Sequence, residues 1–157
     1  MAAQQKLILR RRGVAPVRLR GPIAGRTKVY VDAKILNVHD PTLPRKAYVG
    51  YLVDGDGGRG AKQVEETESD DAEIRAILFA IGELKSTNRR LTIVCDHESV
   101  VAEANREEVR KTSPLMLELR RTLRENKKRI ELQALQANPA HGVVTAYVNS
   151  LKDESSE

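Results

Sequence analysis

The stretch KVYVDAKIL, residues 28–36, places one carboxylate, Asp32, within a run of β-branched, aromatic and aliphatic side chains. This composition predicts a β-strand, and a charge inside such a strand is costly to bury without a partner. Two further acids stand at similar positions. Glu73 lies near the start of an amphipathic stretch, AEIRAILFAIGEL, and Asp96 ends the run LTIVCD. Two acids at strand positions and a third at the start of the intervening helix indicate a shared cation.

The rest of the chain alternates between strand and helix patterns. Strands are predicted at 28–36, 46–54, 61–66, 91–95 and 130–135, and helices at about 70–85, 98–106, 114–127 and 142–152. The loop GDGGRG, residues 55–60, is predicted to be the hairpin between the second and third strands. Ser69 is expected to cap the first helix. The resulting order, βββαβααβα, predicts an α/β fold with a mixed five-stranded sheet flanked by helices.

This order of elements brings the three acids toward one place. A meander followed by a crossover helix sets the first and fourth strands side by side and parallel, and sites in such sheets form beyond the carboxyl ends of strands. Asp96 stands at such an end, and Asp32 lies near the middle of its strand. Glu73 shares a helix face with Ile77 and Leu84, which turns it toward the sheet.

Length and composition limit the class of protein. The 157 residues fit one domain with a core of its own, and the single Cys excludes an internal disulfide. We expect a reducing compartment and a cytoplasmic protein. No run reaches the ~18 apolar residues of a membrane span, and the N-terminus has no uninterrupted apolar segment of a secretory signal. A transit peptide stays open as an alternative, because residues 1–28 hold eight Lys or Arg and no acid.

The positive charge is concentrated at the N-terminus. The formal net charge is +5, and residues 1–28 contribute +8, so the remainder carries −3. Pro and Gly interrupt this segment, so we expect a basic arm without regular structure at 1–27, a folded domain at 28–152 and a polar tail at 153–157. Such an arm favours binding to a polyanion, and a merely solubilising tail is the alternative. The expected nucleic-acid contacts are Lys6, Arg10, Arg11, Arg12, Arg18 and Arg20.

Three local patterns resemble the ribonuclease H family, within the RNase H-like superfamily of polynucleotidyl transferases. VYVDAKIL resembles the family's first strand, SDDAEIRAILFAI its first helix, and IVCDHESVV its strand-end aspartate followed by a short helix. The resemblance covers about residues 28–152. It implies that Asp32, Glu73 and Asp96 are metal ligands for two Mg²⁺ ions, or Mn²⁺, ~4 Å apart. The implied reaction is hydrolysis of the RNA strand of an RNA/DNA hybrid.

The fourth ligand of the family has two candidate registers. Family members usually carry an Asp in the first turn of the last helix, often four residues after an Asn. The preferred register puts His141 at the Asn position and Thr145 at the Asp position, although a neutral Thr is a poor ligand for Mg²⁺. The other register pairs Asn149 with Asp153. His141 is also a candidate proton shuttle, because it lies in the loop before the predicted last helix.

Two departures from the common bacterial enzyme keep three functions open. The segment NREEVRKTSP leaves little room for that enzyme's basic handle, and the chain has no Trp, so base stacking should contribute little to binding. The first function is a metal-dependent endonuclease that cleaves RNA/DNA hybrids. The second is a nucleic-acid-binding module on the same fold with weak or lost catalysis. The third is a related nuclease, such as a junction resolvase. In each case we expect a monomer.

Overall fold

A computed structural model describes residues 26–55, 57–65, 68–85, 89–108, 112–135 and 139–155, with side chains up to Leu151. The predicted end of the basic arm at residue 27 is wrong, because Arg26 and Thr27 already belong to the first strand of the sheet. The rest of the expected arm, with its six predicted nucleic-acid contacts, lies outside the described residues. So does the side chain of Asp153. None of the described helices combines the length and the apolar character that a bilayer-spanning helix requires.

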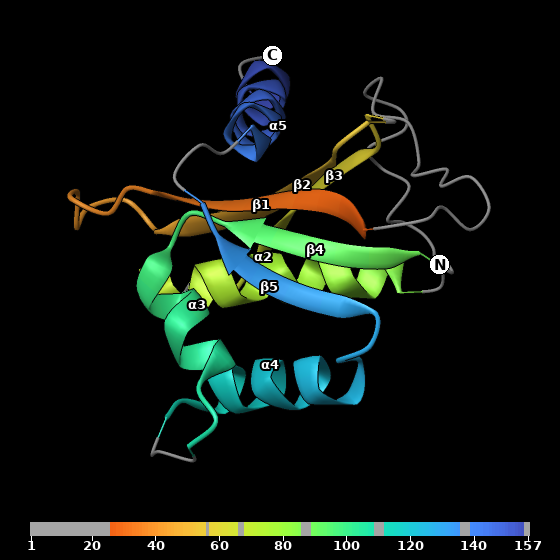
Figure 1. The fold of residues 1–157 in the computed structure, drawn as a ribbon. Helices are drawn as coiled ribbons and strands as arrows, with labels where there is room; N and C mark the ends of the chain where they lie inside the picture. The colour runs from red at the N-terminus through yellow and green to blue at the C-terminus, as the bar shows by residue number, and fades with distance from the viewer. Residues whose placement is uncertain are drawn as a thin grey trace.

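The described residues form the predicted mixed sheet (Figure 1). Its strands, in the spatial order β3-β2-β1-β4-β5, are β1 (Arg26–Leu36), β2 (Lys46–Val53), β3 (Arg59–Val64), β4 (Arg90–Cys95) and β5 (Ile130–Ala134). The first three pair as an antiparallel meander, and β4 pairs parallel to both β1 and β5. The prediction that the first and fourth strands are adjacent and parallel is therefore confirmed.

Four helices in the described part of the chain cover the sheet unequally. They are α2 (Ser69–Leu84), α3 (Glu98–Asn105), α4 (Pro114–Glu125) and α5 (Ala140–Ser155). Helix α5 packs alone on one face, over the meander strands, whereas α2 lies along the opposite face and α4 packs beneath it (Figure 1). The element order is as predicted, and the observed ends differ from the predicted ends by at most three residues.

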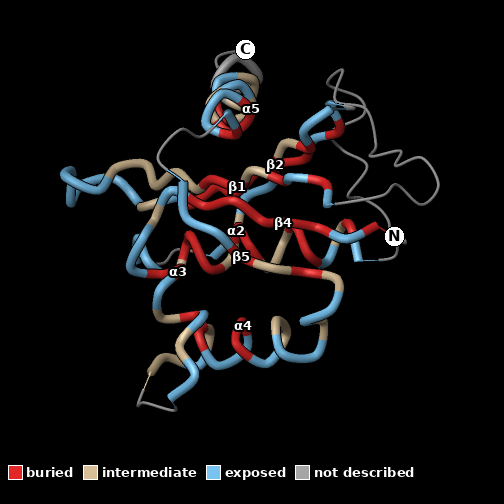
Figure 2. Tube along the Cα trace, viewed as in Figure 1, coloured by how far each residue is buried: buried red, intermediate tan, exposed pale blue. Residues whose placement is uncertain are grey.

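Alternation along the strands divides the core between the two faces of the sheet. Figure 2 shows buried residues along the strands and on the helices at both faces. Val29 and Val31 of β1 join the large core formed with α2, α3 and α4, in which Ile77 is fully buried. On the other face, Tyr48 packs with Val144 of α5 in a smaller cluster. Asp32 lies between Val31 and Ala33, so the same alternation turns it away from the large core.

Local turn chemistry is as predicted at the hairpin and differs at one helix cap. Gly55 and Gly57 adopt φ values of 96° and 75°, which favour glycine, in the turn that joins β2 to β3. The predicted cap at Ser69 is wrong. Glu68 is the extended residue that precedes α2, and its carbonyl accepts the first helical bond, from Ala72 N–H at 2.9 Å. The helical hydrogen bonds of α2 thus begin one residue earlier than predicted, and Ser69 is already helical.

Candidate active site

The candidate site lies in a notch where β1 continues past the end of β4. The last β1–β4 pair is Tyr30 with Val94, while β1 stays paired with β2 as far as Leu36. Two residues beyond that last pair, Asp32 and Asp96 stand at the same level of the two parallel strands. Both carboxylates are therefore presented at the carboxyl end of β4, where sites in such sheets form.

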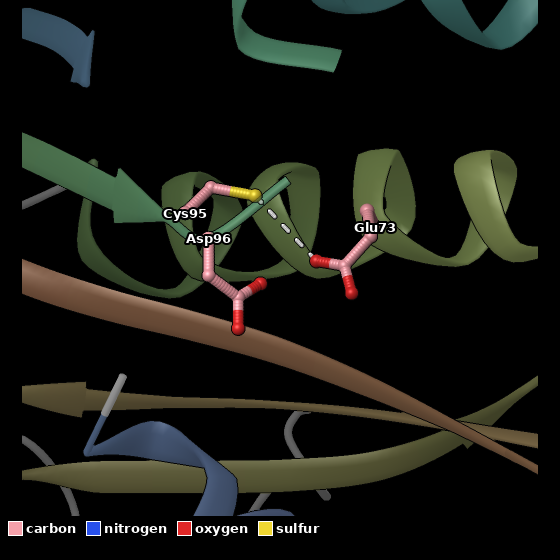
Figure 3. Close-up of side chains that lie close together, drawn as sticks. All are labelled: Glu73, Cys95 and Asp96. Atoms are coloured by element: carbon pink, nitrogen blue, oxygen red, sulfur yellow. Dashed lines mark hydrogen bonds between the residues drawn. The ribbon is translucent and has the colours of Figure 1, made fainter. Parts of the chain in front are cut away.

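Helix α2 brings the third carboxylate into the notch from the other face of the sheet. Glu73 belongs to the second turn of α2 and is only 7% exposed. The Cys95 thiol donates to Glu73 Oε2 at 3.5 Å, and the carboxyl groups of Glu73 and Asp96 both extend toward the space beside β1 (Figure 3). Glu73, Cys95 and Asp96 each offer a ligand atom, and these atoms lie within 4.8 Å of one another.

Asp32 lies outside that compact set but interacts with it electrostatically. Burial raises the pKa of Asp32, and the negative charge of Asp96 raises it further, whereas a hydrogen bond with His141 opposes the rise. Burial likewise raises the pKa of Glu73 to about 8, and the charges of Asp32 and Asp96 add to the effect. Asp96 is thus close enough to disfavour the charge of both buried acids, and Asp32 that of Glu73.

This donor set is chemically suited to a hard divalent cation. The carboxylates of Asp32, Glu73 and Asp96 offer oxygen atoms, which are the ligands that Mg²⁺ and Mn²⁺ prefer. Burial of Asp32 and Glu73 has a cost in the metal-free protein, and a bound cation would offset that cost by favouring their charged forms. The residues present therefore fit such an ion.

The first turn of α5 contacts the acid of β1 in the notch. His141 is the second residue of α5, and its Nδ1 lies 3.0 Å from Asp32 Oδ2. The His141 side chain is 70% exposed, whereas that of Asp32 is 6% exposed. One turn later, the Thr145 hydroxyl is buried and makes no hydrogen bond with any residue that the structure describes. Of the two α5 candidates, His141 is the one in contact with an acid of the site.

Sequence reasoning missed the contacts that flank Asp96. Cys95 contacts Glu73 through its thiol, and its Sγ accepts from the His97 backbone N–H at 3.4 Å. His97 Nε2 lies 2.9 Å from Asp70 Oδ1. The residues on either side of Asp96 are thereby tied to the first turns of α2. Strand alternation places Cys95 opposite Asp96, toward α2, and this was the only signal in the sequence for its contact.

Several solved structures are similar to this architecture. The RNase H1 of the halophilic archaeon Halobacterium salinarum NRC-1 aligns with a TM-score of 0.59 at 18% identity, over 80% of this chain and 99% of that chain. LC11-RNase H1, solved in complex with an RNA/DNA hybrid, aligns with a TM-score of 0.58 at 17% identity, over 77% and 95%. The fold is that of ribonuclease H. An N-terminal RNase H domain from Mycobacterium tuberculosis also aligns, with a TM-score of 0.55 at 13% identity, over 80% and 98%.

The RNase H-like fold is thus established by three-dimensional similarity and not by sequence similarity. No protein-family model matches the sequence, and no curated protein does. The resemblance drawn from the three short motifs is confirmed for the fold. The three alignments cover 99%, 95% and 98% of the solved RNase H chains.

Proposed function

We propose that this protein is a metal-dependent endonuclease that hydrolyses the RNA strand of RNA/DNA hybrids. The observation that carries the proposal is the notch beyond β4, where Asp32 and Asp96 stand at the same level of adjacent parallel strands and Glu73 reaches them from α2. The RNase H-like fold supports the reaction class, and LC11-RNase H1, which has this fold, was solved with a hybrid bound.

The proposed roles follow from where each side chain lies. Asp32, Glu73 and Asp96 would hold Mg²⁺ or Mn²⁺ in a two-metal site. When bound, such ions activate the attacking water and stabilise the leaving oxygen of the phosphodiester. The exposed imidazole of His141 would complete the site on the α5 side. In the preferred of the two registers, Thr145 would take the position of the family's fourth acid. The basic residues from Lys6 to Arg20 would hold the substrate through its phosphates.

A second candidate function is a nucleic-acid-binding module with weak or lost catalysis. The observation that favours it is the Thr145 hydroxyl, which is neutral, buried and without a hydrogen bond to any described residue. A site with three carboxylates would hold its metals with less negative charge than one with four. Binding by such a module would depend on the arm and not on the acids.

The test compares cleavage with binding in the full-length protein. Purified protein is incubated with an RNA/DNA hybrid, duplex DNA, duplex RNA and a four-way DNA junction, each with Mg²⁺ or Mn²⁺, and the products are separated on a gel. Cleavage of the RNA strand of the hybrid alone is expected. Asp32→Asn should abolish cleavage while hybrid affinity stays equal or rises, because a negative charge beside the phosphates is removed.

Asp54→Asn is the matched control, since Asp54 is exposed in the β2–β3 turn, and it should cleave like the native protein. Hybrid binding without cleavage under either metal would favour the binding module. Cleavage of the junction but not of the hybrid would indicate a resolvase. Unchanged cleavage by Asp32→Asn would exclude the assigned site.

A further inference from the structure

The last helix presents an imidazole, and not a carboxylate, to the buried acid of β1. His141 Nδ1 and Asp32 Oδ2 are 3.0 Å apart, and the imidazole reaches Asp32 from the open side of the notch. We propose that His141 is the fourth metal ligand of this site and that its nitrogen gives the centre a preference for transition ions such as Mn²⁺ and Co²⁺ over Mg²⁺. This inference rests on the proposed function, because it assigns a residue to the metal site of that nuclease.

The spacing of the two atoms suits a shared ion. Two ligand atoms bound at ~2.1 Å, at right angles on an octahedral ion, are about 3 Å apart. The observed Nδ1–Oδ2 separation of 3.0 Å is that of a hydrogen bond and equally that of two such ligand atoms. Asp32 is the hydrogen-bond partner of the ring among the described residues, through Nδ1, and the side chain of His141 is 70% exposed.

The backbone of α5 fixes where this imidazole lies. Val144 is fully buried, and it packs so closely on Gly50 that a Cβ built there would lie 2.7 Å from Val144 Cγ2. Gly50 is the partner of Asp32 in the β1–β2 register. The close approach of helix and sheet therefore occurs directly beside Asp32. It brings the first turn of α5 within reach of the carboxylate.

Thr145 does not compete with His141 for this role. Its hydroxyl is neutral and buried, and no hydrogen bond joins it to the acids among the residues described. Imidazole, by contrast, is an established ligand of first-row transition ions, whereas Mg²⁺ favours oxygen ligands and retains water. A site of three carboxylates and one imidazole should therefore discriminate between Co²⁺ or Mn²⁺ and Mg²⁺ more strongly than a site of carboxylates alone.

The experiment measures metal binding directly, without substrate. Metal-free full-length protein is titrated with CoCl₂ and, separately, with MgCl₂ by isothermal titration calorimetry, and the visible spectrum of bound Co²⁺ is recorded. His141→Ala and His141→Asn should each lower Co²⁺ affinity by at least about tenfold and shift the Co²⁺ absorption bands, while Mg²⁺ affinity stays nearly unchanged. His141→Asp should raise Mg²⁺ affinity. His39→Ala, at an exposed His of the β1–β2 loop, is the matched control and should bind both ions like the native protein.

Three outcomes would overturn the inference. Native Co²⁺ affinity and spectrum in His141→Asn would show that the ring only hydrogen-bonds Asp32, which Asn can imitate. Equal losses for Co²⁺ and Mg²⁺ would show a general effect on the site and not ligation by nitrogen. Loss of Co²⁺ affinity in the His39 control would place the ion elsewhere. The Asp32→Asn variant distinguishes failure of the His141 inference from failure of the proposed function. If Asp32→Asn binds both ions like the native protein, the acidic site itself is wrong.

Discussion

At the scale of single residues, Asp32 and Glu73 are the side chains whose burial conflicts with their charge. Both are less than a tenth exposed, and burial raises the pKa of each. No Lys or Arg is among the groups that shift the pKa of either acid. Buried acids of this kind are typical of functional sites, where a cation or substrate makes up for their cost.

The raised pKa of Glu73 predicts how the stability of the metal-free protein depends on pH. Its pKa is about 8 in the folded protein against an ordinary value of 4.5, chiefly because of burial. The folded state then binds more protons than the unfolded chain between these values. Its stability is therefore highest below the ordinary pKa and falls as the pH rises through about 8.

Glu73→Gln removes this contribution. In urea unfolding with EDTA, the variant should exceed the native protein by a few kcal/mol above the raised pKa of Glu73, and differ little near its ordinary value. Glu118→Gln, at an exposed position of α4, is the control and should show no such change with pH. A native protein whose stability in EDTA rises steadily over this range would contradict the assignment.

The hydroxyl of Thr145 is a further polar group that folding buries. This hydroxyl has no partner among the described residues, so Thr145→Val, which keeps the shape, should raise the free energy of unfolding by about 1 kcal/mol. Metal affinity and hybrid cleavage should stay at native levels, since the structure brings His141 and not Thr145 to Asp32. Lost metal binding in Thr145→Val would restore Thr145 as a ligand. Lost activity in Asp153→Asn would instead favour the Asn149–Asp153 register.

At the scale of elements, the site depends on how closely α5 lies against the meander. The absence of a side chain at Gly50 permits this approach, because a Cβ would meet Val144 Cγ2 at 2.7 Å and the Gly60 carbonyl oxygen at 3.1 Å. Gly60 belongs to the neighbouring strand, so the backbone on that side has little freedom to move. Val144 is β-branched and fully buried, so its side chain has little freedom to rotate. Displacement of α5 is therefore the expected response, and it would carry His141 away from Asp32.

Gly50→Ala should therefore cost about 1–3 kcal/mol of stability and also weaken Co²⁺ binding. Gly82→Ala is the matched control. Gly82 is exposed in α2 with nothing within 4 Å of a built Cβ, so this change should stabilise the protein by about 0.5–1 kcal/mol and leave metal affinity unchanged. Thermal unfolding and calorimetric titration of both variants provide the comparison. Native Co²⁺ affinity in Gly50→Ala would mean that the helix position does not determine the site.

At the scale of the whole molecule, the charge is unevenly divided along the chain. Residues 1–28 contribute +8 to a net charge of +5, whereas the rest of the chain, which holds the three acids, carries −3. A negatively charged domain gains little from long-range attraction to a polyanion, so affinity for nucleic acid should depend on the N-terminal segment.

Removal of residues 1–25 tests this division. The cut is placed before Arg26 because Arg26 and Thr27 already pair with β4. The shortened protein should bind hybrid more weakly, with a flatter dependence on salt, since each phosphate contact adds ~0.9 to the log–log slope on duplex B-DNA. Fluorescence anisotropy at several salt concentrations measures both quantities, and the thermal transition should stay unchanged. Equal slopes with and without the segment would exclude its role as a tether.

Local residue patterns were enough to predict the order and type of the elements and the acids that belong to them. Alternation around Asp32, helical periodicity below Glu73 and the apolar run before Asp96 are local patterns, so each could be recognised within about ten residues. The N-cap of α2 was predicted at Ser69 instead of Glu68. The two choices differ only in which residue's carbonyl accepts the first helical hydrogen bond. Such a one-residue choice depends on how the preceding chain enters the helix.

The side chains that meet in the notch are brought together by long-range packing. The contact of Cys95 with Glu73 joins residues 22 apart in sequence, and that of His141 with Asp32 joins residues 109 apart. Both depend on the strand register and on how closely α2 and α5 approach the sheet, which local residue patterns do not encode. The motif resemblance placed Thr145 at the fourth position. Packing of α5 against Gly50 instead brings His141 to the acid, because helix position is set by side-chain volume at the interface.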